Sequence, residues 1–166
     1  MQRHLRRSVT GKDMNSESVY LEADAAYENG EIEKAFRLFL RAAEEGDYDA
    51  MARVANMYSC GEGVTCNYEK AIEWEQRAIA SGKTSSYINL AISYRTIGDM
   101  RMAKQWLEEA YRAGDGEAAL ELAKLYTVCE SSKDTVLKYL NDTLHSPNVS
   151  EGSVEEAREL LREYTE

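Results

Sequence analysis

The sequence predicts an all-α protein that is built from repeated pairs of helices. Alanine, glutamate, leucine, lysine and arginine dominate its 166 residues, which include one proline and no long Val/Ile run with a period of two. Glycines also return at a regular distance, because Gly46 and Gly82 are 36 residues apart and Gly82 and Gly114 are 32 apart. Repetition at such a distance is typical of helical repeat arrays, in which each repeat is one supersecondary unit.

The same two spacings relate many other positions. They connect Val54, Leu90 and Leu122; Ala55, Ala91 and Ala123; Tyr58, Tyr94 and Tyr126; Ala71 and Ala103; and Trp74 and Trp106. Chance similarity between alanine-rich helices would not keep this register. The four-residue difference falls between the two helices, because 12 residues separate Tyr58 from Ala71 and 8 separate Tyr94 from Ala103. In this region residues 61–66 have the shorter counterpart 96–99.

Each repeat is predicted to be a pair of amphipathic helices. In the first helix the apolar face holds Ala50, Val54, Ala55 and Tyr58, and in the second it holds Ala71, Trp74, Ala78 and Ile79. We expect the alanines to let the backbones approach closely and the aromatic residues to fill the remaining space. Glycine after each second helix is expected to end it in a left-handed conformation.

The outer helices follow the same pattern. We predict helices over residues 16–29, 32–45, 115–128 and 134–145, a break over 147–152, and a last helix that begins with the capping box Ser153-Val154-Glu155-Glu156. That helix has one apolar side and one charged side, as expected of the end of an array. The predicted organisation is a flexible basic tail over 1–15 and a single domain over 16–166, with repeats over 16–45, 46–81, 82–113 and 114–146 and a cap helix over 153–164.

Charge and composition exclude several functions. The net charge is −10, and the four basic residues among the first twelve leave −14 on the remainder, which disfavours nucleic-acid binding. No apolar stretch approaches the length of a membrane span, and no secretory signal is seen at the N-terminus. Three cysteines leave at least one unpaired, which fits a reducing compartment and a cytoplasmic location.

The sequence offers no constellation for catalysis, a metal or a cofactor. Cys60, Cys66 and Cys129 match no zinc-site spacing, and the only histidines are His4 and His145. A nucleophile would need a base held beside it, and neither histidine is well placed for that role. Neighbouring carboxylates point in different directions along a helix. We therefore expect no enzyme activity.

Residues 42–82 resemble a Sel1-like repeat, a relative of the tetratricopeptide repeat. The resemblance is carried by the Gly61-Glu62-Gly63-Val64 loop and by Lys70-Ala71 with Trp74 downstream. It is strongest over 42–82, fair over 83–126 and weaker over 16–41 and 127–145. It implies a right-handed α/α superhelix of about four helix pairs plus a C-terminal capping helix, whose concave face binds proteins.

The tetratricopeptide register also implies which side chains of each first helix face the groove. They are Asp49, Ala52, Asn56 and Ser59; Ser85, Ile88, Ile92 and Arg95; and Glu117, Leu120, Lys124 and Thr127. From these we predict a partner-binding surface with an apolar centre of Ile88, Ile92 and Leu120 and a polar rim of Asp49, Asn56, Arg95, Glu117 and Lys124. An equally open alternative is that tight curvature buries the apolar residues against a neighbouring helix or the C-terminal cap.

The favoured function is a non-enzymatic protein–protein interaction module, or adaptor. The acidic body predicts a protein or peptide partner with a basic face, because charge complementarity speeds association. Two alternatives stay open: a bacterial immunity protein that neutralises a toxin, a role known in the Sel1-like family, and a self-associating structural protein.

Overall fold

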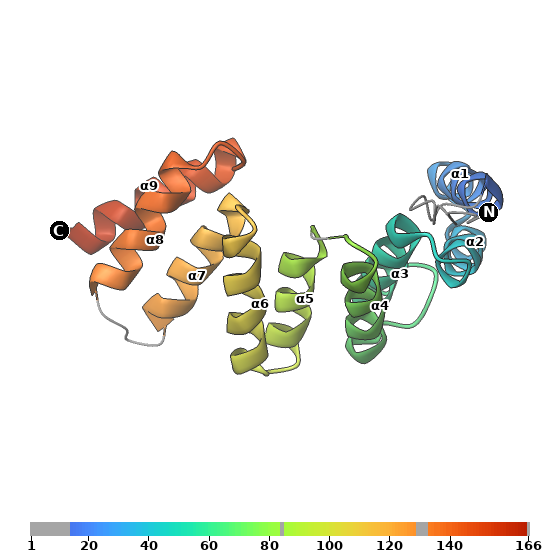
Figure 1. Ribbon diagram of the computed structural model, residues 1–166, viewed down its shortest axis with the longest axis horizontal. Coiled ribbons are helices and arrows are strands. Elements are labelled where there is room, and N and C mark those ends of the chain that lie inside the picture. The colour runs from blue at the N-terminus through green and yellow to red at the C-terminus, as the bar shows by residue number, and fades with distance from the viewer. Residues whose placement is uncertain (1–13, 84, 129–132, 166) are drawn as a thin grey trace, which may run out of the picture. The chain divides into compact units, whose positions relative to one another are not determined.

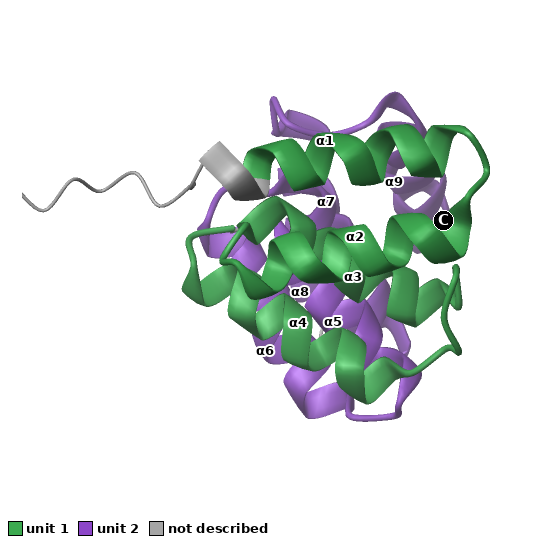
Figure 2. Ribbon diagram, turned by 90° about the vertical axis from the view of Figure 1, so that its right-hand side faces the viewer, with its two compact units in different colours: residues 1–83 green, residues 84–166 purple. Residues whose placement is uncertain are grey.

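The computed structural model describes residues 14–83, 85–128 and 133–165, and within these ranges it contains nine α-helices and no strand (Figure 1). The predicted all-α repeat fold is thereby confirmed. The chain divides into two compact units, residues 1–83 and 84–166 (Figure 2). Each unit is described by itself.

Unit 1 consists of two helix pairs. Its helices are α1 (Met14–Glu28), α2 (Ile32–Glu44), α3 (Tyr48–Cys60) and α4 (Tyr68–Ala80). Helix α1 packs on α2, α2 on α3, and α3 on α4. The larger side chains Phe39, Val54 and Met57 are fully buried among alanines. Ala55 and Ala71 are buried as predicted, so the backbones can approach closely at these positions.

Unit 2 consists of two further pairs and a final single helix. Its helices are α5 (Ser86–Thr96), α6 (Met100–Arg112), α7 (Gly116–Val128), α8 (Lys133–His145) and α9 (Glu151–Thr165). Helix α9 packs on α8 and, more sparsely, on α7. Ala91 and Ala103 are buried, as the repeat register predicted. The apolar side of α9 contributes Ala157, Leu160, Leu161 and Tyr164 to the core, while its other side is charged.

The fourth helix pair follows the register of the third with different residues. A spacing of 33 residues takes Ala103 to Val136 and Ala110 to Thr143, and both Val136 and Thr143 are buried. The same spacing takes Trp106 to Tyr139, which stacks on Tyr126 with ring centroids 5.6 Å apart. The pair therefore has the repeat architecture although its sequence departs from the pattern.

Glycine ends the second helices as predicted. Gly46, Gly82 and Gly114 all have positive φ angles, of 100°, 100° and 86°. At the end of α2, the N–H of Gly46 donates to the Ala43 carbonyl at 3.1 Å and the N–H of Asp47 donates to the Ala42 carbonyl at 3.0 Å. These bonds satisfy carbonyls that the helix leaves unpaired.

The loop after α3 packs against the preceding helix pair. Gly63 lies so close to α2 that a Cβ atom there would be 2.6 Å from the Ile32 carbonyl oxygen. Glu62 Oε2 accepts a hydrogen bond of 2.9 Å from the Tyr27 hydroxyl at the end of α1. Packing between repeats therefore explains the glycine at position 63, whereas Gly61 caps α3 with a φ of 73°.

Two predicted boundaries need correction. The last helix begins at Glu151, and Ser150 caps it by accepting a hydrogen bond of 3.2 Å from the N–H of Ser153. The predicted capping box at Ser153 is wrong because Ser153 already lies in the first turn. At the other end, Met14 and Asn15 are helical, and the rest of the predicted basic tail lies outside the described residues.

Candidate functional site

A chain of ion pairs crosses the first helices of unit 2. The Arg95 guanidinium on α5 lies 2.7 Å from the Glu121 carboxylate on α7. Lys124, one turn further along α7, lies 2.5 Å from Glu121 and 3.2 Å from Glu156 on α9. We call these four residues the charge ladder. It connects three helices that are far apart in the sequence.

Glu121 is the most enclosed member of the ladder, with a side chain that is 17% exposed. Burial alone would raise the pKa of its carboxyl group, but the hydrogen bonds from Lys124 and Arg95 outweigh burial and lower this pKa. Burial likewise opposes the charge of Lys124, and its bonds with Glu121 and Glu156 still raise the pKa of the amine. Both shifts favour the charged forms of Glu121 and Lys124, and these two opposite charges neutralise one another.

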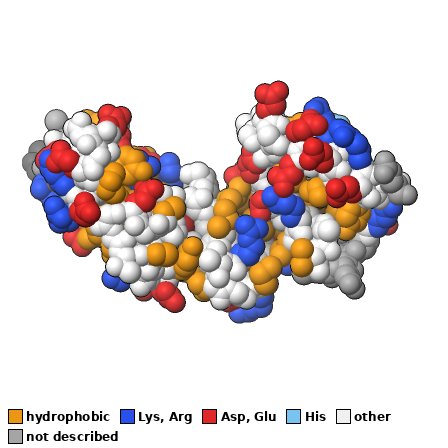
Figure 3. Space-filling model, turned by 180° about the vertical axis from the view of Figure 1, so that it is seen from behind, with side chains coloured by type: hydrophobic (Ala, Val, Ile, Leu, Met, Phe, Trp, Pro, Cys, Tyr) orange, Lys and Arg blue, Asp and Glu red, His pale blue; other side chains and the backbone are white. Residues whose placement is uncertain are grey.

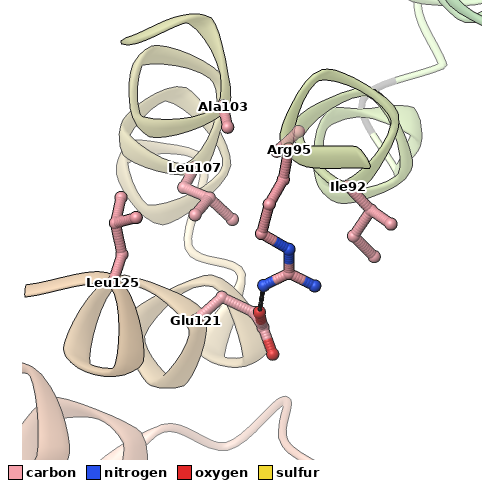
Figure 4. A pocket seen from close by; sticks show the side chains of 7 residues that line it. Ile92, Arg95, Ala103, Leu107, Glu121 and Leu125 are labelled. Carbon is pink, nitrogen blue, oxygen red and sulfur yellow. Dashed lines mark hydrogen bonds and ion pairs between the residues drawn. The ribbon is translucent and has the colours of Figure 1, made fainter. Parts of the chain in front are cut away.

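A small apolar hollow lies beside the ladder. It is lined by Ala91, Ile92, Arg95, Ala103, Leu107, Glu121 and Leu125. Figure 4 shows Arg95 reaching from α5 to Glu121 on α7, with the side chains of Leu107 on α6 and Leu125 on α7 beside them. Ile92 lies at the edge of this hollow and is 39% exposed. Water therefore contacts an apolar side chain next to an ordered polar network.

The three predicted apolar contact residues have different environments. Ile92 is exposed, Ile88 is half-buried, and Leu120 is only 2% exposed. Leu120 packs in a cluster with Val136, Leu140 and Ala157, so it cannot belong to an exposed apolar centre. For Leu120 the alternative expectation, burial against the C-terminal cap, is correct, because helix α9 packs over this part of α7.

Glu117 is also engaged inside unit 2. Its carboxylate accepts a 2.7 Å hydrogen bond from the backbone N–H of Ser150 and another bond from the Ser153 hydroxyl. Its expected place on an open polar rim is therefore corrected. The connection between α8 and α9 supplies Ser150, and the first turn of α9 supplies Ser153.

In unit 1 the corresponding surface lies on α3. Asp49 forms an ion pair of 2.8 Å with Lys83, and Asn56 is exposed. Between them lies Arg53, whose guanidinium carbon is 4.4 Å from the centroid of the Tyr27 ring. The groove register did not include Arg53. It could have been found by helical spacing, because it comes four residues after Asp49 and three before Asn56.

The described thiols do not form a metal site. Cys60 and Cys66 are exposed free cysteines, and the Cys66 thiol donates a hydrogen bond of 3.2 Å to the Ser59 carbonyl. Within the described ranges no three His, Cys, Asp or Glu side chains gather as metal ligands, and Cys129 lies outside these ranges. None of the helices described is long and apolar enough to cross a membrane.

The helix pairs with their Gly-x-Gly-Val loop can now be compared with known families. The family model of the Sel1 repeat matches residues 23–47, 49–83 and 85–115, which together make up more than half of the chain. The chain belongs to the Sel1 repeat family. The matches end before the fourth pair of this Sel1 repeat protein, where Val136, Tyr139 and Thr143 replace two alanines and a tryptophan.

Solved structures show the same fold at low sequence identity. A Sel1 repeat protein from Oxalobacter formigenes is 23% identical, with a TM-score of 0.69 over 81% of this chain and 60% of that one. The antigen c5321 of uropathogenic Escherichia coli strains is 16% identical, with a TM-score of 0.70 over 92% of this chain and 38% of that one. YrrB, a TPR protein, is 17% identical, with a TM-score of 0.63 over 93% of this chain and 82% of that one.

This Sel1 repeat protein therefore spans 60% and 38% of the lengths of the first two structures. No curated protein matches it in sequence. Sel1 and tetratricopeptide-like repeats generally mediate interactions between proteins, and they are typically non-catalytic.

Proposed function

We propose that this Sel1 repeat protein is a non-enzymatic adaptor and that a protein or peptide partner docks on unit 2 around Ile92. The observation that carries the proposal is the exposed Ile92 side chain beside the apolar hollow and the charge ladder. An apolar residue at the centre of a surface, surrounded by ordered polar groups, is the usual composition of a protein interface.

The charges around Ile92 determine which kind of partner surface is complementary. Arg95 and Lys124 are already neutralised by Glu121 and Glu156, so the basic residues of this surface provide little unpaired positive charge. Acidic residues outnumber basic ones by 30 to 20 in the whole chain, and on the face seen in Figure 3 both kinds are interspersed. A partner with an apolar anchor and a basic surround is therefore the best complement.

The likeness to YrrB supports a peptide as one form of this partner. YrrB is described as a TPR protein with an unusual peptide-binding site, and it shares the fold of this chain. At least one protein of this fold is thus able to hold a peptide.

The proposal is tested by replacing Ile92 with glutamate. Ile97→Glu is a matched control, because Ile97 is 45% exposed at the end of the same helix and does not line the hollow. Affinity capture from cell lysate with wild type, I92E and I97E, read by mass spectrometry, identifies candidate partners. Binding of each purified candidate to the three proteins is then measured by calorimetry.

We expect I92E to weaken binding at least about tenfold, which corresponds to the loss of one anchoring side chain, and I97E to bind like wild type. Equal affinity of all three proteins would refute docking at Ile92. Circular dichroism melting checks that both variants fold, which is expected because exposed substitutions change stability little. Leu120 is unsuitable for this test, since a charge there would disrupt the core.

A further inference from the structure

Arg53 is an arginine without an acidic partner in an acidic protein. Among the described residues it takes part in no ion pair, and its buried Nε atom has no hydrogen-bond acceptor. Its guanidinium instead lies over two aromatic rings, 4.4 Å from the centroid of Tyr27 and 5.6 Å from that of Phe39. When the flat face of a guanidinium packs on a ring, the N–H donors at its edge stay available to other acceptors.

The repeat register places Arg53 at a contact between successive first helices. Two repeats, a spacing of 68 residues, separate Gly30 from Gly98, Ala35 from Ala103, Tyr27 from Arg95, and Arg53 from Glu121. The contact of Tyr27 with Arg53 in unit 1 is thus the counterpart of the ion pair of Arg95 with Glu121 in unit 2. In unit 2 a guanidinium meets a carboxylate of the same chain. In unit 1 Arg53 stands at the position of Glu121, its guanidinium meets the Tyr27 ring, and among the described residues no carboxylate forms an ion pair with it.

The acidic residues described near Arg53 form no ion pair with it, and two of them have other partners. Asp49 pairs with Lys83 at 2.8 Å, and Glu62 accepts the hydrogen bond of the Tyr27 hydroxyl. Asp24 raises the pKa of the Tyr20 hydroxyl and Arg53 lowers it, so both charges act on Tyr20. Among the described contacts, Asp24 forms no ion pair with Arg53. Asp24 therefore adds negative charge to the surroundings of Tyr20, where Arg53 also acts, and opposes an anion that approaches this surface.

We propose that Arg53, held in place by Tyr27, binds a carboxylate of a protein or peptide partner. The planar fork of arginine matches the two oxygens of a carboxylate, and such charge-assisted bonds are about twice as strong as neutral ones. The carboxylate belongs either to an aspartate or glutamate side chain or to a chain terminus. This site lies in unit 1 and does not depend on docking around Ile92.

The test follows the side-chain N–H signal of Arg53 in the full-length, ¹⁵N-labelled protein by NMR. Three peptides are titrated: acetyl-Gly-Glu-Glu-Gly-amide, acetyl-Gly-Gln-Gln-Gly with a free carboxylate, and the same glutamine peptide as its amide. Arg37, an exposed residue of α2, provides an internal reference in the same spectra.

We expect a saturable shift of the Arg53 signal with a carboxylate peptide, with affinity about tenfold above that for the neutral peptide, and no such shift for Arg37. A response to the glutamate peptide assigns the ligand to side chains, and a response to the free terminus assigns it to chain ends. Shifts of Arg53 that match those of Arg37, or equal responses to all three peptides, would overturn the proposal.

Two variants sharpen the result. Arg53→Lys keeps the charge and loses the fork, so we expect affinity to fall about tenfold. Asp24→Asn removes a negative charge that opposes the anion, so we expect tighter binding; unchanged affinity in both variants would place the peptides elsewhere. If Arg53→Lys fails to fold, the comparison of Arg53 with Arg37 in wild type still decides. Docking at Ile92 is judged separately by the I92E experiment.

Discussion

The carboxylate of Glu117 and the backbone N–H of Ser150 are joined by a hydrogen bond of 2.7 Å. The Ser153 hydroxyl donates to the same carboxylate. These bonds connect the first turn of α7 with the beginning of α9. Among the described helices, α9 packs on α8 and more sparsely on α7, so its attachment depends on contacts such as these and on its apolar side.

Glu117→Gln should therefore loosen unit 2. Glutamine has the same size, but its amide nitrogen cannot accept a hydrogen bond, and the charge that strengthens the remaining bond is lost. We expect the free energy of unfolding to fall by about 1–2 kcal/mol. Urea denaturation measures this change. Glu159→Gln on the exposed side of α9 is the control and should leave stability within about 0.5 kcal/mol; an equal loss in both variants would contradict the role of Glu117.

The same carboxylate should make stability depend on pH. Burial opposes its charge, but the bonds from Ser153 and Ser150 outweigh burial and lower the pKa of Glu117 below the usual 4.5. Between these two pKa values the unfolded chain binds more protons than the folded one, so stability rises with pH. The contribution is present above about pH 4.5 and is lost as the pH falls through the lower, folded value.

Urea midpoints of wild type and E117Q at pH 7, 5, 4 and 3 would measure this dependence. The difference between the two proteins should shrink as the pH falls below the usual pKa. A difference that stays constant down to pH 3 would show that the charge of Glu117 does not contribute.

Gly116→Ala should be destabilising, although alanine normally favours a helix over glycine by up to about 1 kcal/mol. A Cβ atom at Gly116 would lie 2.2 Å from Val149 Cγ2 and 2.6 Å from Ser146 Cβ. The connection between α8 and α9 would have to move. Gly152→Ala is the matched control, because its Cβ would meet nothing within 4 Å and should stabilise α9. Thermal melting should shift in opposite directions for the two variants; a shift in the same direction would refute the packing argument.

Gly63→Ala should cost more than Gly30→Ala. Both glycines have positive φ, 68° and 78°, so both substitutions strain the backbone. Only Gly63 adds a collision, with the Ile32 carbonyl 2.6 Å away, whereas nothing lies within 4 Å at Gly30. We expect a loss of about 1 kcal/mol at Gly30 and clearly more at Gly63, measured by urea denaturation. Equal losses would mean that the loop can move away from the Ile32 carbonyl without a further loss of stability.

The repeat register could be predicted from the sequence, and the functional surface could be predicted only in part. The spacing that relates Ala55 to Ala91 identified buried positions in both units, because a residue's place on its own helix follows from local periodicity. Leu120 and Glu117 were misplaced for a different reason. Their exposure depends on α9 and on the connection before it, and the spacing within α7 carries no information about what covers that helix.

The sequence by itself determined that the chain forms helix pairs, which positions of each helix face the core, and where glycine ends the second helices. These features follow from hydrophobic periodicity and from backbone preferences, which act over a few residues. The tertiary structure decided that Arg95 meets Glu121 and that Arg53 meets Tyr27. Each of these contacts joins residues 26 positions apart on successive first helices, so it depends on how neighbouring pairs stack.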